Sequence, residues 1–316
     1  MRYIEDFKEN DTIIEHYFCK EKNQLKTKAG KTYLSLKLVD KTGSIDGKVW
    51  EMNNDIQSFE SGDFIKVKGI VLAYQNELQL RISAIRKSSE GEYVPQDYTP
   101  TTEKNIDSLV ERFNSFIASL DNPKLRTLVE NIVFKNPTIS QCLRSHSAGK
   151  QLHHSYSGGL LEHSISVTEL CDFLSSRYKY VNRDILITSA LLHDMGKVFE
   201  LSPHPENEYT DIGQLMGHIS IMSELVGKEA EKIPDFPKKS ELLIKHCLLS
   251  HHGEYEYGSP KLPMIIEAMI LHVADNGDAR IKMFEEALEK DKTQNDWVGF
   301  QKSLNRNIRK SGNDVQ

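Results

Sequence analysis

The spacing of hydrophobic positions changes once along this chain, near residue 100. Over residues 1–90 apolar and other side chains alternate, as in YLSLKLVD, which carries Leu34, Leu36 and Leu38 at every second position. A period of two is typical of a half-buried β-strand. Further segments of this kind lie at 11–19, 44–50, 64–74 and 77–87. About five short strands with lysine and aromatic side chains on one face predict a small β-barrel.

From about residue 103 the apolar positions follow a helical period, as in IDSLVERFNSFIASL and LITSALLHDMGKVFEL. The intervening GEYVPQDYTPTT carries two prolines and little apolar content, as expected of a linker. The polar, mildly basic end predicts a frayed helix and a loose tail. We therefore expect a multidomain chain with a barrel at 1–90, a linker at 91–102, a mostly α-helical domain at 103–300 and a polar tail at 301–316.

Length and composition agree with two soluble domains. The chain has 316 residues, of which 38% are hydrophobic and 27% charged, so it has enough apolar side chains for a sizeable core. No apolar run approaches the ~20 residues that span a bilayer. The first residues, MRYIEDFKEN, lack the apolar core of a signal peptide. The sequence therefore predicts a cytoplasmic protein without a membrane partner.

Charge is distributed unevenly along the chain. The formal net charge of −6 excludes a protein that is basic throughout. Residues 20–48, however, contain eight lysines against Glu21, Asp40 and Asp46, a local net charge of +5 (8 − 3). Nucleic-acid binding needs such a local patch rather than a global excess.

The motif LLHDMGK at 191–197 carries the most specific chemistry. His193 and Asp194 stand side by side after an apolar run, and Gly196 is placed to end that helix. Neighbouring side chains on a helix diverge by ~100°, so both can reach one metal only if the helix end points at it. Taken alone, the pair also fits a capping Asp beside a hydrogen-bonded core His.

Other imidazole and carboxylate side chains lie within apolar helical segments on both sides of this motif. They are His163, His218, His251, His252 and Asp275. Each one alone is more often a hydrogen-bonded core residue than a ligand. Burying an ionised Asp275 is costly unless a positive charge compensates it. So many such sites in one helical domain indicate a metal centre.

This ordered set resembles the HD-domain superfamily of metal-dependent phosphohydrolases over residues 150–285. The resemblance implies that one metal is held by His163, His193, Asp194 and Asp275. It also implies a second metal, held by His218, His251 and a bridging Asp194. Which of His251 and His252 ligates stays open; we favour His251 and give His252 a role toward substrate or behind the ligands. Lys197 is expected near the scissile phosphate.

The expected chemistry is direct attack by water, with Asp194, Lys197 and His252 as catalytic residues. Two cations can lower the pKa of a bridging water and neutralise phosphoryl charge. Imidazole and carboxylate ligands suit several divalent metals, and no thiolate selects among them. In the segment LHHSYSGGLLEH, His153, His154 and Tyr156 are candidate substrate contacts. A polar loop at the start of a helix explains these three residues equally well.

The barrel segment KTKAGKTYLSLKLVDKTGSIDGKVW resembles an OB-fold nucleic-acid-binding module. Such a barrel stacks bases on aromatic rings while lysines follow the phosphates. Tyr33 and Trp50 are the stacking candidates. The phosphate contacts are expected from Lys28, Lys31, Lys37 and Lys48. The alternatives are a solvated lysine face and a docking module.

An OB-like module ahead of an HD domain, with GGLLEH and LLHDMGK, is similar to the YhaM family of bacterial 3′→5′ exoribonucleases. The resemblance implies release of nucleoside monophosphates from single-stranded RNA, with two divalent ions, Mn²⁺ first and Fe, Ni, Co or Mg as alternatives. Single-stranded DNA is a second candidate substrate, and a homo-oligomer stays open. Two other functions compete: hydrolysis of small or cyclic nucleotides, and nucleic-acid binding by a regulatory protein with an inactive HD domain.

Overall fold

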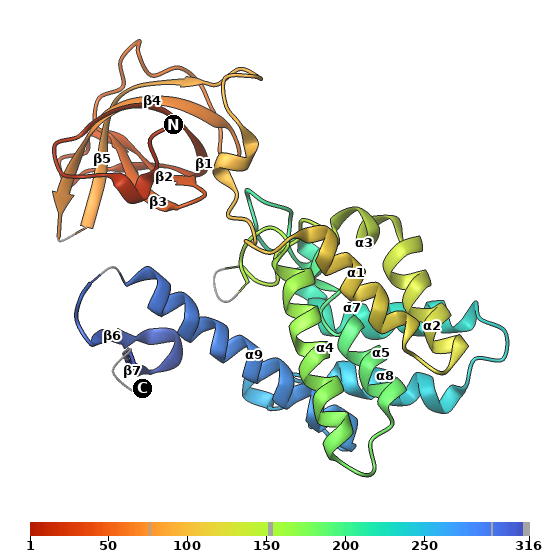
Figure 1. The fold of residues 1–316 in the computed structure, drawn as a ribbon. Helices are drawn as coiled ribbons and strands as arrows, with labels where there is room; N and C mark the ends of the chain where they lie inside the picture. Colours follow the sequence, from red (N-terminus) through yellow and green to blue (C-terminus); the bar gives the residue numbers. More distant parts are fainter. Residues whose placement is uncertain (76, 151–153, 292, 312–316) are drawn as a thin grey trace. The chain divides into compact units, whose positions relative to one another are not determined.

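A computed structural model describes residues 1–75, 77–150, 154–291 and 293–311 (Figure 1). The chain divides into two compact units. The first comprises Met1–Thr101 and His204–Glu206, and the second comprises Thr102–Pro203 and Asn207–Gln316. We call them the barrel unit and the helical unit.

The barrel unit is a closed five-stranded barrel with the order β1-β2-β3-β5-β4, which confirms the predicted OB-fold. Its strands are β1 (Thr12–Lys26), β2 (Thr32–Asp40), β3 (Gly43–Val49), β4 (Phe64–Tyr74) and β5 (Glu77–Lys87). β3 and β5 pair in parallel, and all other neighbours are antiparallel. The barrel closes because β1 is long enough to pair with both β2 and β4.

The alternating pattern places one set of side chains inside this barrel. Leu34, Leu36 and Leu38 are buried, and the residues between them are not. A bulge between β4 and β5 lies at Gly69, where an added Cβ would come within 2.5 Å of the Arg81 carbonyl oxygen. The strands therefore approach there more closely than a side chain allows, which helps the sheet to curve.

The segment predicted to be a linker is partly ordered on the barrel. A short 3₁₀-helix, η2 (Pro95–Tyr98), buries Tyr98. The Tyr98 ring meets Phe64 edge-on at 4.9 Å between centroids, Tyr93 stacks on Phe64 at 4.0 Å, and Tyr93 and Tyr98 also meet edge-on at 6.0 Å. These aromatic contacts account for the order of a segment with little other apolar content.

The helical unit surrounds one central helix. Its helices are α1 (Ile106–Ala118), α2 (Pro123–Glu130), η3 (Asn131–Lys135), α3 (Pro137–Cys142), α4 (Gly159–Arg177), α5 (Arg183–Leu192), α6 (Lys197–Glu200), α7 (Asp211–Glu231), α8 (Lys238–Ser250), η4 (Tyr255–Tyr257) and α9 (Ile266–Lys290). In α5 every residue from Ile185 to Leu192 is buried, and α4, α8 and α9 pack around it. A helix that is apolar on all sides belongs in such a position.

The end of the described chain differs from the predicted frayed helix. After α9 the chain forms a hairpin of β6 (Trp297–Gln301) and β7 (Arg306–Arg309), joined by η5 (Lys302–Leu304) (Figure 1). The helical expectation is therefore wrong for residues 297–301 and 306–309, which form strands. The hairpin forms because Asn305 adopts a left-handed conformation at the turn, while Leu304 and Ile308 are buried.

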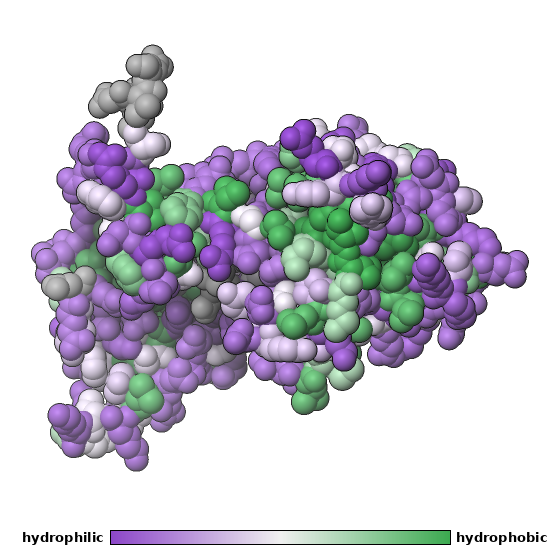
Figure 2. Space-filling model, turned by 90° about the horizontal axis from the view of Figure 1, so that it is seen from below, coloured by the Kyte–Doolittle hydropathy of each residue, from purple (hydrophilic) through white to green (hydrophobic). Residues whose placement is uncertain are grey.

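The surface is mostly polar, with apolar side chains gathered in separate patches on the face drawn in Figure 2. Within the described residues, none of the helices combines the length and apolar character that crossing a membrane requires.

Candidate metal centre

Five helices and the turns that follow them bring the predicted ligands together. His163 lies in the first turns of α4, His218 in α7 and Asp275 in α9. His193 and Asp194 directly follow α5, and His251 and His252 directly follow α8. Because these residues are contributed by segments far apart in sequence, the centre exists only in the folded helical unit.

The pair His193–Asp194 reaches one cluster because the helix ends before it. α5 ends at Leu192, and residues 193–196 form turns. The expectation that Gly196 ends this helix is therefore wrong. Instead, an added Cβ on Gly196 would lie 2.5 Å from the backbone oxygen of His218. Glycine at this position lets α7 approach closely enough to bring His218 to the centre.

Asp194 lies between two groups of histidines. Its Oδ2 is 3.4 Å from Nε2 of His163 and 3.5 Å from Nε2 of His193. Its Oδ1 is 3.5 Å from Nε2 of His218 and 3.8 Å from Nε2 of His251. Each carboxylate oxygen therefore faces a different group, as a bridging ligand requires.

The first group consists of His163, His193 and Asp275, whose ligand atoms all lie within 4.8 Å of one another. Nε2 of His163 is 3.1 Å from Oδ1 of Asp275 and 3.4 Å from Nε2 of His193. Two ligands that bind one cation at ~2.1 Å are separated by ~3.0–3.4 Å. These spacings therefore suit a single ion.

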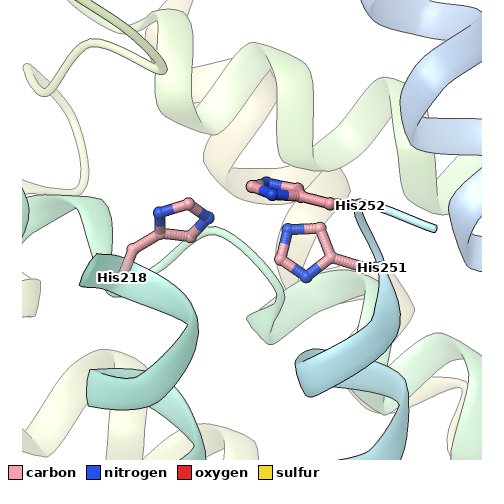
Figure 3. A group of neighbouring side chains, drawn as sticks. All are labelled: His218, His251 and His252. Atoms are coloured by element: carbon pink, nitrogen blue, oxygen red, sulfur yellow. The ribbon is translucent and has the colours of Figure 1, made fainter. Parts of the chain in front are cut away.

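The second group consists of His218, His251 and His252, whose rings converge from α7 and from the end of α8 (Figure 3). The ring centroids of His251 and His252 are 4.4 Å apart, and His218 is 5.2 Å from His252. His251 is fully buried and His252 is half-buried. The geometry therefore offers both adjacent histidines to a cation, and only His252 is also open to solvent.

Each of these histidines is held through Nδ1, which leaves Nε2 to face the centre. Nδ1 of His163 is 2.8 Å from Asp278, and Nδ1 of His218 is 3.0 Å from Glu200. The Nδ1 atoms of His193, His251 and His252 lie 2.7–2.9 Å from the backbone oxygens of Ala190, Leu248 and Tyr257, respectively. Donation from Nδ1 fixes the tautomer in which Nε2 carries the lone pair that binds a metal.

The electrostatics of the centre favour a cation. Burial opposes ionisation of Asp194, yet Lys197 and His193 hold the pKa of its carboxyl well below the usual range. Burial also opposes ionisation of Asp275, but His163 and His193 likewise lower its pKa. Burial lowers the pKa of His251 well below its ordinary value, so this imidazole is neutral at neutral pH. Buried carboxylates beside a neutral imidazole such as His251 attract divalent cations.

Two buried polar atoms also indicate that the centre binds a cation. Among the described residues, Oδ1 of Asp194 and Nε2 of His218 have no hydrogen-bond partner. They lie 3.5 Å apart, and both offer lone pairs. Buried polar groups are nearly always satisfied, and one divalent cation between these two atoms would satisfy both. The residues present therefore fit a divalent metal.

The remaining predicted site residues of the helical unit lie around the centre. Lys197 is half-buried and donates to Oδ2 of Asp194 at 2.6 Å. His154 is buried behind His163, with Nε2 3.1 Å from Asp278 and Nδ1 2.9 Å from the Tyr156 hydroxyl. His153 lies outside the described residues.

Three carboxylates beside the centre were not predicted from the sequence. Glu200 and Asp278 anchor His218 and His163, respectively, and Glu162 accepts from the hydroxyls of Tyr156 and Thr102. Asp278 lies three residues after Asp275 on α9, a spacing that puts both on one helix face and could have revealed it. Glu200 is the last residue of the short helix α6, and no spacing rule connects it to His218.

The predicted nucleic-acid residues share one area of the barrel unit. The Tyr33 and Trp50 rings stack at 4.6 Å between centroids, with 24° between their planes. Lys48 donates to Ser35 at 2.6 Å on the same face, where Lys37 is paired across the strands with Asp46. Lys28 and Lys31 are exposed at the turn between β1 and β2. The structure thus brings two stacked rings close to several cations.

Comparison with known proteins supplies family relationships for both units. Family models for an OB-fold nucleic acid binding domain and an HD domain match residues 20–87 and 160–280, respectively. The chain is 37% identical over 263 residues to the 3′-5′ exoribonuclease YhaM of Geobacillus sp. (strain WCH70). That match covers 83% of this chain and 80% of the relative.

Two solved structures were also compared with this chain. The second OB-fold domain of replication protein A from Methanococcus maripaludis is 24% identical, covers 28% of this chain and 96% of its own, and gives a TM-score of 0.24. Aspartyl tRNA synthetase from Entamoeba histolytica is 14% identical, covers 75% of this chain and 55% of its own, and gives a TM-score of 0.23. Similarities this low carry no weight for function.

Proposed function

The chain belongs to the YhaM family of 3′-5′ exoribonucleases, and from this membership we propose that it releases nucleoside monophosphates from the 3′ end of single-stranded RNA with two bound divalent cations. With its OB-fold and HD domain it is a metal-dependent hydrolase of phosphodiester bonds. The observation that carries the two-metal proposal is the placement of the Asp194 oxygens, one toward each histidine group.

We assign the ligands by these two groups. His163, His193 and Asp275 would hold one cation, His218 and His251 the other, and Asp194 would bridge them. When bound, the cations lower the pKa of a water ligand and neutralise charge on the phosphoryl group. Manganese is our first choice, with Fe, Ni, Co and Mg as alternatives, because imidazole and carboxylate suit all of these.

The other residues act on the substrate. Lys197 supplies a fixed positive charge beside Asp194, where it stabilises the charge that develops on the phosphoryl oxygens. His252 is anchored through Nδ1 yet half-open to solvent, which suits contact with the phosphate or the leaving group. His153, His154 and Tyr156 are our further candidates for substrate contacts, and the burial of His154 favours a role behind His163.

The barrel captures the single strand. Tyr33 and Trp50 stack on bases, and Lys28, Lys31, Lys37 and Lys48 follow the phosphates. Stacking of this kind does not select the 2′-hydroxyl, so single-stranded DNA should also bind.

The experiment uses protein stripped of metal and resupplied with one divalent cation at a time. RNA labelled at its 5′ end should shorten stepwise from the 3′ end with manganese, releasing nucleoside 5′-monophosphates, and a matching DNA reports sugar preference. The Asp194→Ala variant should leave both strands intact. Intact RNA with the wild-type chain under every cation would refute the proposal, and hydrolysis of small nucleotides would then become the leading function.

A further inference from the structure

The hairpin after α9 has one buried face and one exposed face. Ile308 is buried and pairs with Gly299 across the hairpin. Because side chains alternate along a strand, the cross-strand pairs on either side of Ile308 face outward. These pairs are Trp297 with Arg309 and Phe300 with Asn307, and all four residues are exposed. We call these four residues the hairpin face.

We propose that the hairpin face binds single-stranded RNA upstream of the 3′ end that occupies the metal centre. This inference rests on the proposed function and adds a second RNA-binding surface, in the helical unit. Trp297 and Phe300 are 56% and 57% exposed. They provide most of the apolar surface of this short hairpin. Exposed aromatic rings on a small sheet are the means by which many single-strand binders stack bases.

The positive charge of the hairpin segment favours a nucleic-acid partner. Residues 293–311 contain four basic side chains and one acidic one, a local net charge of +3 (4 − 1) within a chain of net charge −6. Arg309 pairs with Asp296, but no acidic side chain of the described residues pairs with Lys302 or Arg306. Basic side chains beside exposed aromatic rings suit a single-stranded nucleic acid, whose phosphates are negative and whose bases can stack. A second copy of this acidic chain offers no such combination of negative charge and stacking bases.

The hairpin is also ordered in advance of any partner. Leu304 and Ile308 are buried, and β6 and η5 lie against α9. Lys310 ties the end of the hairpin to α9 by an ion pair with Asp291 at 2.9 Å, and its backbone N–H donates to Asp296 at 2.7 Å. Side chains on a preformed support lose little freedom on binding.

The position of the hairpin predicts a dependence on RNA length. α9 carries both Asp275 and, at its far end, the start of the hairpin segment (Figure 1). From Asp275 to Lys290 the helix rises by ~22 Å at 1.5 Å per residue. A strand with stacked bases spaced ~3.4 Å apart needs about six nucleotides to cover that length. Shorter RNAs can fill the metal centre without touching the hairpin face.

The experiment compares RNAs of about 5 and about 30 nucleotides as substrates for the double variant Trp297→Ala/Phe300→Ala. We expect KM for the long RNA to rise about ten-fold and KM for the short RNA to change by less than about two-fold. The control, Tyr178→Ala/Tyr180→Ala, removes two exposed rings that follow the C-terminal end of α4, away from His163 near its start. This control should change KM for neither RNA. Equal effects on both RNAs, or no effect on either, would overturn the proposal. Failure of the wild-type chain on both RNAs would instead count against the proposed function.

A direct measurement of RNA binding to the intact hairpin face separates binding from any misfolding of the double variant. Trp50→Phe leaves Trp297 as the sole tryptophan, since the chain has two. Long RNA added to this metal-stripped variant should change the Trp297 fluorescence, and short RNA should not. Light scattering of the wild type and the double variant tests whether a second copy of the chain binds the hairpin face instead of RNA. A wild-type oligomer that the double substitution dissociates would show that the hairpin face binds another copy, and would overturn the proposal.

Discussion

The two units of this molecule place their working side chains in opposite environments. In the barrel unit the proposed RNA-binding residues lie at the surface, where Trp50 is exposed and its stacking partner Tyr33 is half-buried. In the helical unit the proposed ligands His163, His193 and Asp194 are completely buried. A polymer is bound by many weak and replaceable contacts, whereas a cation is bound by a few groups that depend on one another.

This difference has an energetic basis. An exposed lysine near a carboxylate contributes little to stability, because water screens the pair. Buried carboxylates such as Asp194 and Asp275 are stable only with positive charge beside them, and removing one partner leaves a charge uncompensated. We therefore expect substitutions in the helical unit to have larger and less additive effects than substitutions in the barrel unit.

The largest effect should come from Asp194→Asn, which keeps the size of the side chain and removes its charge. Hydrolysis should fall by roughly 10³-fold on both RNA and a small phosphodiester such as bis(p-nitrophenyl) phosphate. RNA affinity, measured by fluorescence anisotropy, should stay unchanged because the barrel unit is intact. Asp172→Asn, on the exposed side of α4, is the control. Loss of RNA affinity in Asp194→Asn would mean that the two units do not act separately.

A smaller effect is expected from Glu200→Gln. Both carboxylate oxygens of Glu200 lie 3.0 Å from Nδ1 of His218, and the neutral amide should orient that ring less firmly. Metal affinity, measured by calorimetry, should fall by roughly 10–100-fold, with kcat at saturating metal largely retained. Glu224→Gln, exposed on α7, the helix that carries His218, should bind metal like the wild type. An unchanged affinity in Glu200→Gln would remove Glu200 from the centre.

In the barrel unit, Tyr33→Ala combined with Trp50→Ala should raise KM for RNA by about ten-fold, because stacking is worth ~1–3 kcal/mol per base. The rate on a small phosphodiester should not change, since that substrate needs no strand capture. The increase should persist at high salt, whereas substitution of Lys28 and Lys31 should weaken the salt dependence itself. Equal losses on both substrates would indicate that the barrel unit supports the fold rather than the substrate.

The smallest effect concerns acid stability of the barrel unit. Hydrogen bonds from the Arg86 side chain and the Ser89 backbone lower the pKa of Glu92 to about 2, from an ordinary value of 4.5. A depressed carboxyl pKa stabilises the fold above the ordinary pKa, and this contribution is lost as the pH falls through about 2. Glu92→Gln should therefore lose less stability than the wild type between these two pH values.

Trp50 fluorescence in a Trp297→Phe background would follow that acid transition. The shift in midpoint should be small because the Arg86–Glu92 pair is exposed to solvent. Glu90→Gln, in the same segment, serves as the control. Identical acid transitions for Glu92→Gln and the wild type would show that this pair contributes nothing to stability.

The sequence predicted the architecture better than the details of the centre. The alternation around Leu36 and the helical period around Leu191 are global signals, repeated over many residues, and they determine which faces are buried. The hairpin at residues 297–309 was missed because only Leu304 and Ile308 of its last turn and strand are apolar and buried. A single apolar residue in a polar strand is too weak a signal of strand period.

Within the centre, the sequence indicated residues by chemical type and apolar context, and the structure brings those residues together. It did not indicate Glu200, because the contact with His218 depends on a turn and on a kink at Gly217 within α7. Orientation of a ring by a carboxylate depends on tertiary geometry, and periodicity along one segment does not encode it.

The spread of the proposed ligands along the sequence has a consequence for folding. His163 and Asp275 are 112 residues apart in the sequence. The other proposed ligands lie between them and are contributed by different helices and the turns after them. A cation bound there acts as a reversible cross-link that only the folded helical unit can form, so its binding energy adds to the stability of that unit. At a metal concentration of 100 Kd the gain is ~2.7 kcal/mol. We therefore expect a chelator to destabilise the helical unit, which is the larger part of the chain, and to leave the barrel unit folded.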